Sequence, residues 1–353
     1  MNPIKDLKVV ELASVLAGPT VGTFFAELGA KVIKFENKTI GGDVTRNWKT
    51  QGEGNGISAY YSAANFNKQV VFANLKDEED RKMVLSHLES ADILITNFKY
   101  GDNEKLGFDY NTLKKKFPKL IVGEVRGFAN DKERVAYDVV LQAETGFMSM
   151  NGTPTSGPIK MPVAMMDLLA AHQLKEGLLV ALLQREKTKK GSLVYTTLEE
   201  SGIATLANQA SNFLMNGKVA QPIGSLHPNI APYGETFTCK DKQQVVLAIG
   251  SDRQFQLLCE IAGNTQLAFD SHFKTNPDRV TNRAVLQQKL SNLISQLNSQ
   301  ELLQKCHSLH VPVAAVKTID QVLNSETGKE MILEELIEET KTRRVKTIAF
   351  NII

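Results

Sequence analysis

The chain has 353 residues, of which 42% are hydrophobic and 23% are charged, and this ordinary globular composition and length predict about two domains. Its 41 lysines and arginines and 39 acidic residues leave a formal net charge of +2, which argues against a nucleic-acid partner because nucleic-acid-binding domains carry a basic face. No apolar run approaches the roughly 18–20 residues of a membrane span, the first residues lack a signal-peptide pattern, and three widely spaced cysteines exclude a disulfide framework and a paired-cysteine zinc site. We therefore expect a cytoplasmic enzyme or binding protein with no membrane partner and no metal.

Strand and helix patterns alternate through the first 125 residues. Short apolar runs predict strands at residues 8–12, 31–36, 70–75, 92–96 and 119–125. The spacing of apolar residues predicts a helix over 20–30 that ends at Gly29, and the charged segment 77–90 also fits a helix. This alternation predicts an α/β fold with a mostly parallel, doubly wound sheet.

The pattern changes after residue 165. We expect, in chain order, a long helix over 167–187, a strand over 192–198, a helix over 199–217, a hairpin within 235–250, helices near 252–262, 282–296 and 299–309, and a last strand over 311–316. The segment 218–235 contains several prolines and glycines without periodicity, which predicts a linker. The expected organisation is a large domain over 1–217, the linker over 218–235 and a smaller α+β domain over 236–310.

The loop over residues 13–19 follows the first predicted strand, at an edge where open α/β sheets bind ligands. It lacks the three glycines of a dinucleotide-binding turn, because it offers only Gly18 and then Gly22. Pro19 would suit the first position of the next helix. A compact turn beneath a helix is therefore favoured over a dinucleotide site in which Glu36 would bind a ribose.

Asp167 follows a plausible strand over 158–166 and opens the long helix. Its carboxylate has two interpretations at this place. It could cap the helix and complement the helix dipole. It could instead act as a nucleophile, because a helix N-terminus would keep it ionised and an ionised carboxylate can attack an activated carbonyl. A single residue does not distinguish the two.

Two further pairs of residues are candidates for a ligand site. Tyr137 and Asp138 precede an apolar segment, and they could either start a helix or line a pocket. Asn97 and Phe98 follow the predicted strand 92–96 and hence lie at a carboxyl end of the sheet. There the amide and the aromatic ring could hold a base or merely close a turn.

Several segments resemble one family of enzymes. VVELASVLAGPTVGTFFAELGAKVIKFE at 9–36, followed by GGDVTRNW at 41–48, resembles the opening of the class III CoA-transferases, the CaiB/BaiF family that includes formyl-CoA transferase and carnitine CoA-transferase. Further blocks in the family's order are NFNKQVVFANLK (65–76), TNFKYGDNEKLGFDY (96–110), GEVRGFA (123–129), YDVVLQAETG (137–146) and HPNIAPYGETF (227–237). Their order and spacing, from about residue 7 to about 325, identify the chain as a member of this family.

The resemblance implies a chemistry for the site. The family's nucleophilic aspartate corresponds to Asp167, which would pass CoA from an acyl-CoA donor to a carboxylic acid through an aspartyl-acyl anhydride and an aspartyl-CoA thioester. Backbone N–H groups at the helix start would stabilise the oxyanions. The CoA thioester is then a substrate, and no cofactor is bound permanently. The family's CoA contacts correspond to Leu16, Ala17, Asn37, Ala73, Lys76, Asn97, Phe98, Lys99, Lys105, Val135, Tyr137 and Asp138.

The resemblance also implies an architecture. Members of the family have a large Rossmann-like domain and a smaller domain, and they form a homodimer in which two ring-like chains interlock. The segment 311–353 would accordingly return to the large domain. Lys76, Lys99 and Lys105 would supply cations for the phosphates of CoA.

The chain departs from the family at several positions, and two other activities stay open. Leu16 and Asn37 stand where polar or basic side chains are common, and Leu168 follows the aspartate where small residues are usual. The glycine-rich flap of formyl-CoA transferases has no counterpart, so a specificity for oxalate or formate is not implied.

The α-methylacyl-CoA racemases of the same family carry a histidine where this chain has Tyr137. The remaining alternative is a CoA-ester-binding protein without turnover, which would not need Asp167.

Overall fold

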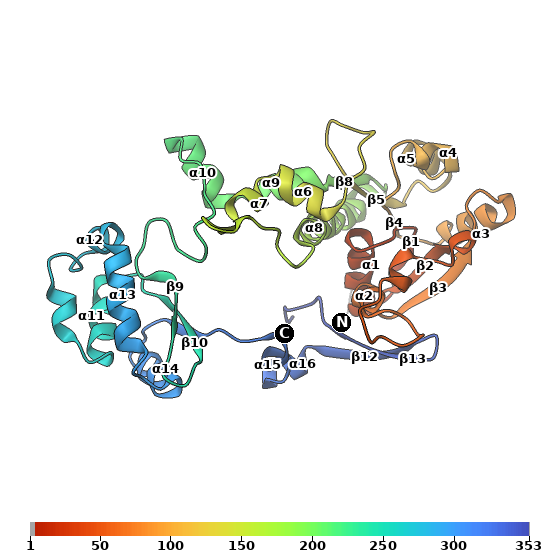
Figure 1. Ribbon diagram of the computed structural model, residues 1–353. Coiled ribbons are helices and arrows are strands. Elements are labelled where there is room, and N and C mark those ends of the chain that lie inside the picture. The colour runs from red at the N-terminus through yellow and green to blue at the C-terminus, as the bar shows by residue number, and fades with distance from the viewer. Residues whose placement is uncertain (1–3, 353) are drawn as a thin grey trace. The chain divides into compact units, whose positions relative to one another are not determined.

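A six-stranded parallel sheet forms the centre of the first of two units (Figure 1). The computed structural model describes residues 4–352. The first unit comprises the residues up to Gly152, Ser156–Gln221 and the residues from Lys329 on, and the second comprises Thr153–Thr155 and Pro222–Gly328. Residues 1–3 and 353, which belong to the predicted segments 1–217 and 311–353, lie outside the described residues.

The strands of the sheet run in the order β3-β2-β1-β4-β5-β8, and each neighbouring pair is parallel. Their bounds are β1 Lys8–Glu11, β2 Lys31–Asn37, β3 Lys68–Ala73, β4 Ile93–Thr96, β5 Ile121–Arg126 and β8 Leu193–Thr197. The predicted parallel α/β sheet is thereby confirmed. Because the strand order reverses between β1 and β4, the carboxyl ends of these two strands flank the crevice where such sheets bind ligands.

Helices cover both faces of this sheet (Figure 1). The helices of the first unit are α1 Ala17–Glu27, η1 Lys38–Ile40, η2 Val44–Asn47, α2 Ala59–Ala63, α3 Glu78–Leu88, α4 Asp102–Leu106, α5 Tyr110–Lys116, α6 Asp138–Glu144, α7 Phe147–Met150, α8 Met165–Thr188, α9 Leu198–Ala204 and α10 Ala207–Asn216. On one face α1 and α8 bury Phe25 and Leu174, and on the other α3 and α5 bury Val84 and Leu113. The helices that follow β1 and β5 thus cover one face and those that follow β3 and β4 cover the other, as in a doubly wound sheet.

Three local predictions are wrong. The first helix begins at Ala17, so Pro19 is its third residue and not its first. The segment 158–166 is not a strand, because only the two-residue strands β6 (Gly152–Thr153) and β7 (Gly157–Pro158) pair there, and Pro162 beyond them cannot donate to a ladder. The helix predicted over 199–217 is two helices, separated at Ala207, where φ is +47°.

The second unit is built on an antiparallel sheet in the order β11-β10-β9. Its strands are β9 Tyr233–Thr238, β10 Gln244–Ala248 and β11 Val313–Ala315, and its helices are α11 Asp252–Ile261, η3 Thr265–Phe269, α12 Asn276–Thr281, α13 Arg283–Ile294, α14 Ser299–Ser308, α15 Ile319–Leu323 and the start of α16 Glu326–Glu330. All three cysteines are free thiols buried in this unit, where desolvation raises their pKa values. The last strand, β11, pairs with β10 and so belongs to this unit. The unit extends beyond β11 to Gly328.

The end of the described chain returns to the first unit as a hairpin of β12 (Ile332–Ile337) and β13 (Thr340–Val345). Arg344 of this hairpin forms an ion pair with Glu27 of α1, and both side chains are almost fully buried. Glu338 in the hairpin turn accepts a hydrogen bond from Arg46 at 2.9 Å. The hairpin is therefore tied to the N-terminal half of the same unit at two separate places.

Candidate active site

The loop after β1 meets the end of β4 at the reversal of strand order. The side-chain oxygen of Asn97 accepts a hydrogen bond from the Ser14 N–H at 3.0 Å, and its amide nitrogen donates to the Ser14 carbonyl at 2.8 Å. Asn97 was expected to contact CoA or to close a turn. In the structure its amide is engaged with the loop backbone, so Asn97 shapes the crevice between β1 and β4.

Val15, the next residue of this loop, adopts a left-handed conformation with φ of +70°. Valine rarely occupies this region because its branched side chain clashes with the backbone there. The Val15 N–H donates to the carboxylate of Asp43, at 3.1 Å to Oδ2 and 3.4 Å to Oδ1. Asp43 and Asn97 together hold the loop that leads into α1.

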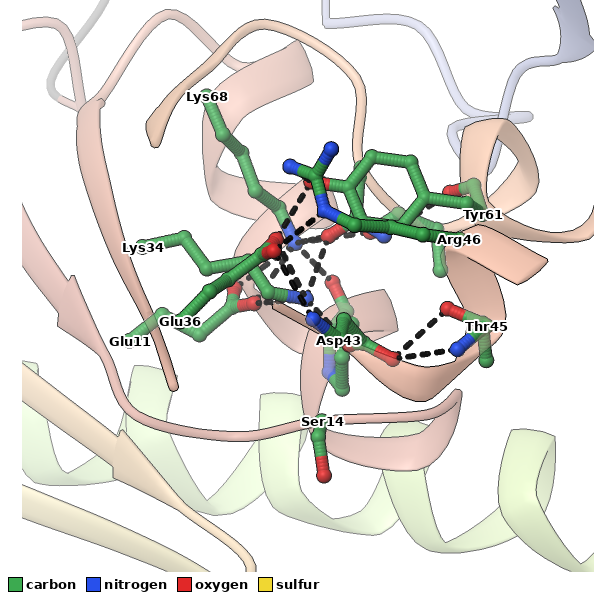
Figure 2. A network of polar contacts seen from close by, with 12 residues as sticks. Glu11, Ser14, Lys34, Glu36, Asp43, Thr45, Arg46, Tyr61 and Lys68 are labelled. Atoms are coloured by element: carbon green, nitrogen blue, oxygen red, sulfur yellow. Dashed lines mark hydrogen bonds and ion pairs between the residues drawn. The ribbon is translucent and has the colours of Figure 1, made fainter. Parts of the chain in front are cut away.

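Asp43 belongs to a buried cluster of charges, which we call the ionic network (Figure 2). Its members are the acids Glu11, Glu36 and Asp43 and the cations Lys34, Arg46 and Lys68. Figure 2 shows the amino groups of Lys34 and Lys68 converging between the carboxylates. Three acidic and three basic side chains are present in this set, and the close opposite charges offset part of the cost of burying each of them.

Lys34 is the centre of the network. Its Nζ lies 2.8 Å from Asp43 Oδ2, 2.8 Å from Asn65 Oδ1 and 3.5 Å from Glu11 Oε1. Burial works against the charge of Asp43, but the ion pair with Lys34 and the hydrogen bonds from Thr45 outweigh it and lower the pKa of Asp43. Burial also lowers the pKa of Lys68 to about 8, although its 2.8 Å ion pair with Glu11 acts in the other direction.

Glu36 lies at the other end of the network. Its two carboxylate oxygens accept from the Tyr61 hydroxyl at 2.6 Å, from the Asp43 N–H at 2.9 Å and from Arg46 Nε. Glu36 is only 3% exposed. Both oxygens of this buried carboxylate are already engaged within the protein, which argues against the alternative in which Glu36 binds a ribose.

Asp167 lies in the first turn of α8, two residues after the helix begins. It does not cap this helix: the N-cap residue is Ala164, which makes no side-chain cap bond, and Asp138 Oδ1 instead accepts from the Met166 N–H at 2.7 Å. Within residues 4–352 no hydrogen bond engages the Asp167 carboxylate. Asp167 therefore does not cap α8, although it lies in the first turn, where a negative charge complements the helix dipole.

The electrostatic surroundings of Asp167 also differ from expectation. Burial, and then the negative charge of Asp138, raise the pKa of Asp167 to about 7, whereas the helix start was expected to keep it fully ionised. Asp138 itself is held by Gln142 Nε2, which donates to Oδ2 at 2.6 Å. Asp167 is thus a poorly solvated carboxyl group that is partly ionised near neutral pH.

Tyr60 is a residue of this site that the sequence analysis missed. Its pKa is raised by burial and then by the charges of Asp167, Asp138 and Asp43, which places the phenol within electrostatic reach of all three carboxylates. Its ring packs edge-on against Trp48, with centroids 5.1 Å apart. The only available signal was the aromatic character of the stretch that follows the glycine-rich loop of residues 41–56.

The predicted CoA contacts all follow the carboxyl ends of strands. Leu16 and Ala17 follow β1, Asn37 ends β2, Ala73 ends β3 with Lys76 just beyond it, Asn97, Phe98, Lys99 and Lys105 follow β4, and Val135, Tyr137 and Asp138 follow β5. Asn37 and Ala73 are also register neighbours. Asn37 Oδ1 accepts from the Thr39 N–H at 3.0 Å and so caps η1, and Lys105 pairs with Asp102 at 3.2 Å while staying exposed.

Comparison with known proteins shows to which family the chain belongs. The family model of CoA-transferase family III matches residues 4–352. The chain belongs to this family. The resemblance found in the sequence is confirmed, and the protein is a CoA-transferase, so the alternative of a binding protein without turnover is set aside.

Relatives of this CoA-transferase match it over most of its length. It is 35% identical over 328 residues to a succinate–glutarate CoA-transferase of Agrobacterium fabrum, covering 91% of this chain and 81% of that protein. It is 32% identical over 327 residues to an acetyl-CoA:oxalate CoA-transferase of Acetobacter aceti, covering 92% and 83%. The crystal structure of a CAIB/BAIF family protein from Brucella suis superposes with a TM-score of 0.86 at 36% identity, covering 99% of this chain and 92% of that one.

The CoA-transferase contains, within its described residues, no helix long and apolar enough to cross a membrane. Acyl-CoA and carboxylic acids are the substrates that the family uses.

Proposed function

We propose that Asp167 is the nucleophile of this CoA-transferase and that the enzyme moves CoA between dicarboxylic acids. One observation carries the first part: Asp167 is a partly buried carboxyl group with a pKa of about 7 and no hydrogen-bond partner in residues 4–352. A carboxylate attacks a thioester efficiently only when it is positioned and stripped of water. The names of the relatives, which act on succinate and glutarate or on oxalate, support the second part.

The proposed reaction has two symmetric halves. The Asp167 carboxylate attacks the thioester carbonyl of the donor, the carbon–sulfur bond breaks, and a mixed anhydride and the CoA thiolate result. The thiolate then attacks the aspartyl carbonyl and expels the donor acid as its carboxylate. The acceptor carboxylate attacks the aspartyl-CoA thioester, releasing the thiolate, which finally attacks the acyl carbonyl of the new anhydride and frees Asp167.

The pKa of Asp167 suits these steps. Asp167 must be ionised to attack, and in the last step it must leave as a carboxylate that burial does not destabilise too strongly. A group with a pKa near the working pH meets both demands. In the first turn of α8 the N–H groups of Met165 and Met166 already donate, to the Val163 carbonyl at 2.7 Å and to Asp138 at 2.7 Å. These two N–H groups would therefore have to give up their present partners before they could donate to the oxyanions of the tetrahedral intermediates.

Trapping the intermediate tests the nucleophile. Incubation with succinyl-CoA and no acceptor should leave CoA on the protein, and hydroxylamine should convert residue 167 to a hydroxamate that peptide mass mapping locates. Asp167→Asn should give neither adduct nor turnover, whereas Asp131→Asn, an exposed acid on the same unit, should behave as the wild type. Full turnover in Asp167→Asn would contradict the proposal.

We also propose that the enzyme is a homodimer. The single chain leaves large apolar side chains open on two helices of the first unit: Val180 and Leu183 of α8 are 64% and 68% exposed, and Leu214 and Met215 of α10 are 79% and 81% exposed. Large apolar side chains that are this exposed support a surface that a partner covers. A light-scattering mass of one chain at micromolar concentration would contradict this proposal.

A further inference from the structure

The loop between β1 and α1 is held in an unfavourable backbone conformation. Val15 has a φ of +70°, which a β-branched residue rarely adopts without outside restraint. The helix that follows has no side-chain cap, because its N-cap residue Leu16 makes no side-chain cap bond. The direction in which the chain enters α1 is therefore determined by the contacts of the loop.

The side chains of Asn97 and Asp43 provide these contacts. Asn97 holds both backbone groups of Ser14, at 3.0 and 2.8 Å. Asp43 accepts from the Val15 N–H with both of its oxygens, the shorter contact being 3.1 Å. Because α1 is held in place by its packing, a return of Val15 to the ordinary region of backbone space would turn the peptide plane between Ser14 and Val15 and disrupt these bonds.

Asp43 is itself held in place by Lys34 and Thr45. It is 4% exposed, and Lys34 Nζ lies 2.8 Å from Oδ2. Thr45 donates to Oδ1 from its N–H at 3.0 Å and from its hydroxyl at 2.8 Å. Figure 2 shows Asp43 between these groups and the Ser14 loop, at the border of the ionic network. The reaction proposed above gives this carboxylate no chemical step.

We propose that Asp43 is a positioning residue for the acyl-CoA substrate. Its carboxylate holds Val15 in the left-handed conformation and thereby fixes Leu16 and Ala17 at the crevice between β1 and β4. The inference rests on the proposed function and on the CoA contacts that the family resemblance implies for Leu16 and Ala17. The ionic network is then the rigid support of the CoA site, and its charge is needed at Asp43 because a neutral amide would offer one acceptor where the loop and Thr45 use two.

Asp43→Asn tests the proposal with the size of the side chain preserved. We expect the dissociation constant for CoA and the KM for the acyl-CoA donor to rise about tenfold or more, while the KM for the acceptor acid and kcat at saturating donor change less than about threefold. Asn65→Ala is the matched control, because Asn65 contacts Lys34 and Lys68 but not the loop. It should lower the thermal midpoint and leave CoA affinity unchanged.

Val15→Gly provides the decisive second test. Glycine adopts positive φ without a side-chain clash, so the loop should need Asp43 less. In the Val15→Gly background, Asp43→Asn should weaken CoA binding by less than about threefold. If Asp43→Asn fails to fold, Thr45→Val removes one of the donors that orient Asp43 and should raise the donor KM about threefold.

The outcomes separate this inference from the proposed function. Asp43→Asn that binds CoA as tightly as the wild type overturns the positioning role, and so does an equal effect of Asp43→Asn in the valine and glycine backgrounds. Either result leaves the proposal that Asp167 is the nucleophile unaffected if the wild-type protein still yields the hydroxamate at Asp167. Absence of that hydroxamate in the wild type overturns the proposed function instead, whatever CoA affinity the Asp43 variants show.

Discussion

Replacing Asp167 by asparagine should stabilise the protein in a pH-dependent way. The pKa of Asp167 is raised from 3.8 to about 7 in the folded chain, so the folded state keeps a proton that the unfolded chain releases. Between these two values the unfolded state binds fewer protons, and stability must therefore fall as pH rises through this window. Above about pH 7 both states are ionised and the loss is complete.

The magnitude follows from the size of the shift. A difference of about three pKa units corresponds to about 4 kcal/mol at full ionisation, and the part that develops between about pH 5 and about pH 8.5 is roughly 2–3 kcal/mol. Asparagine has nearly the same shape and no charge, so the variant escapes this loss. We expect Asp167→Asn to gain roughly 2–3 kcal/mol relative to the wild type when the pH is raised across that range.

Urea unfolding of both proteins at the two pH values and one protein concentration measures this difference. Glu133→Gln, which removes an exposed acid of the same unit, should show no comparable gain. The variant must also be inactive if Asp167 is the nucleophile. A stability difference that is the same at both pH values would refute the argument that Asp167 is desolvated in the folded protein.

The remaining predictions concern CoA, packing and the racemase alternative. Lys105→Ala should weaken CoA binding about tenfold, as expected for a lost charge-assisted contact to a phosphate, and titration calorimetry showing less than a twofold change would remove Lys105 from the site. Gly22→Ala would place a Cβ 1.8 Å from Glu11 Oε2 and should cost about 1–3 kcal/mol in urea unfolding; Gly54→Ala, which has open space around it, should be close to neutral, and equal effects would contradict the packing argument. In D₂O the wild type should exchange little of the α-proton of a 2-methylacyl-CoA, because Tyr137 replaces the histidine base of the racemases; rapid deuterium uptake that Tyr137→Phe abolishes would favour the racemase.

The parallel sheet could be predicted because each of its strands shows as a short run of apolar residues in the sequence. The strand β4 and most of β5 are fully buried, and strands that are covered on both faces must be apolar along their whole length. Residues 158–166 misled the same reasoning, since most of their apolar side chains lie in the loop between β7 and α8. The start of α8 is decided by the bond from Met166 to Asp138, 28 residues earlier in the chain, which no local pattern reveals.

The site was predictable only in part. Asp167 was singled out from its place before a helix, and the family resemblance alone distinguished a nucleophile from a cap. Charged residues within strands, such as Glu11 and Lys34, gave no sign of burial, because an isolated charge is normally solvated. Their burial depends on partners in other segments, and Lys68, which pairs with Glu11, lies 57 residues away.

The hairpin of β12 and β13 sets an order in which the protein can be assembled during synthesis. The second unit is nearly continuous in sequence, from Pro222 to Gly328, whereas the contacts of Arg344 with Glu27 and of Glu338 with Arg46 join residues 317 and 292 positions apart. Contacts of such long range form late, and these two must wait until residue 345 has left the ribosome. Nascent chains stalled with residue 330 exposed should therefore have a protease-resistant second unit and a sensitive first unit; equal resistance of the two would show that the first unit closes without its hairpin. The nascent first unit is thus the part most in need of protection, although most of it is synthesised first.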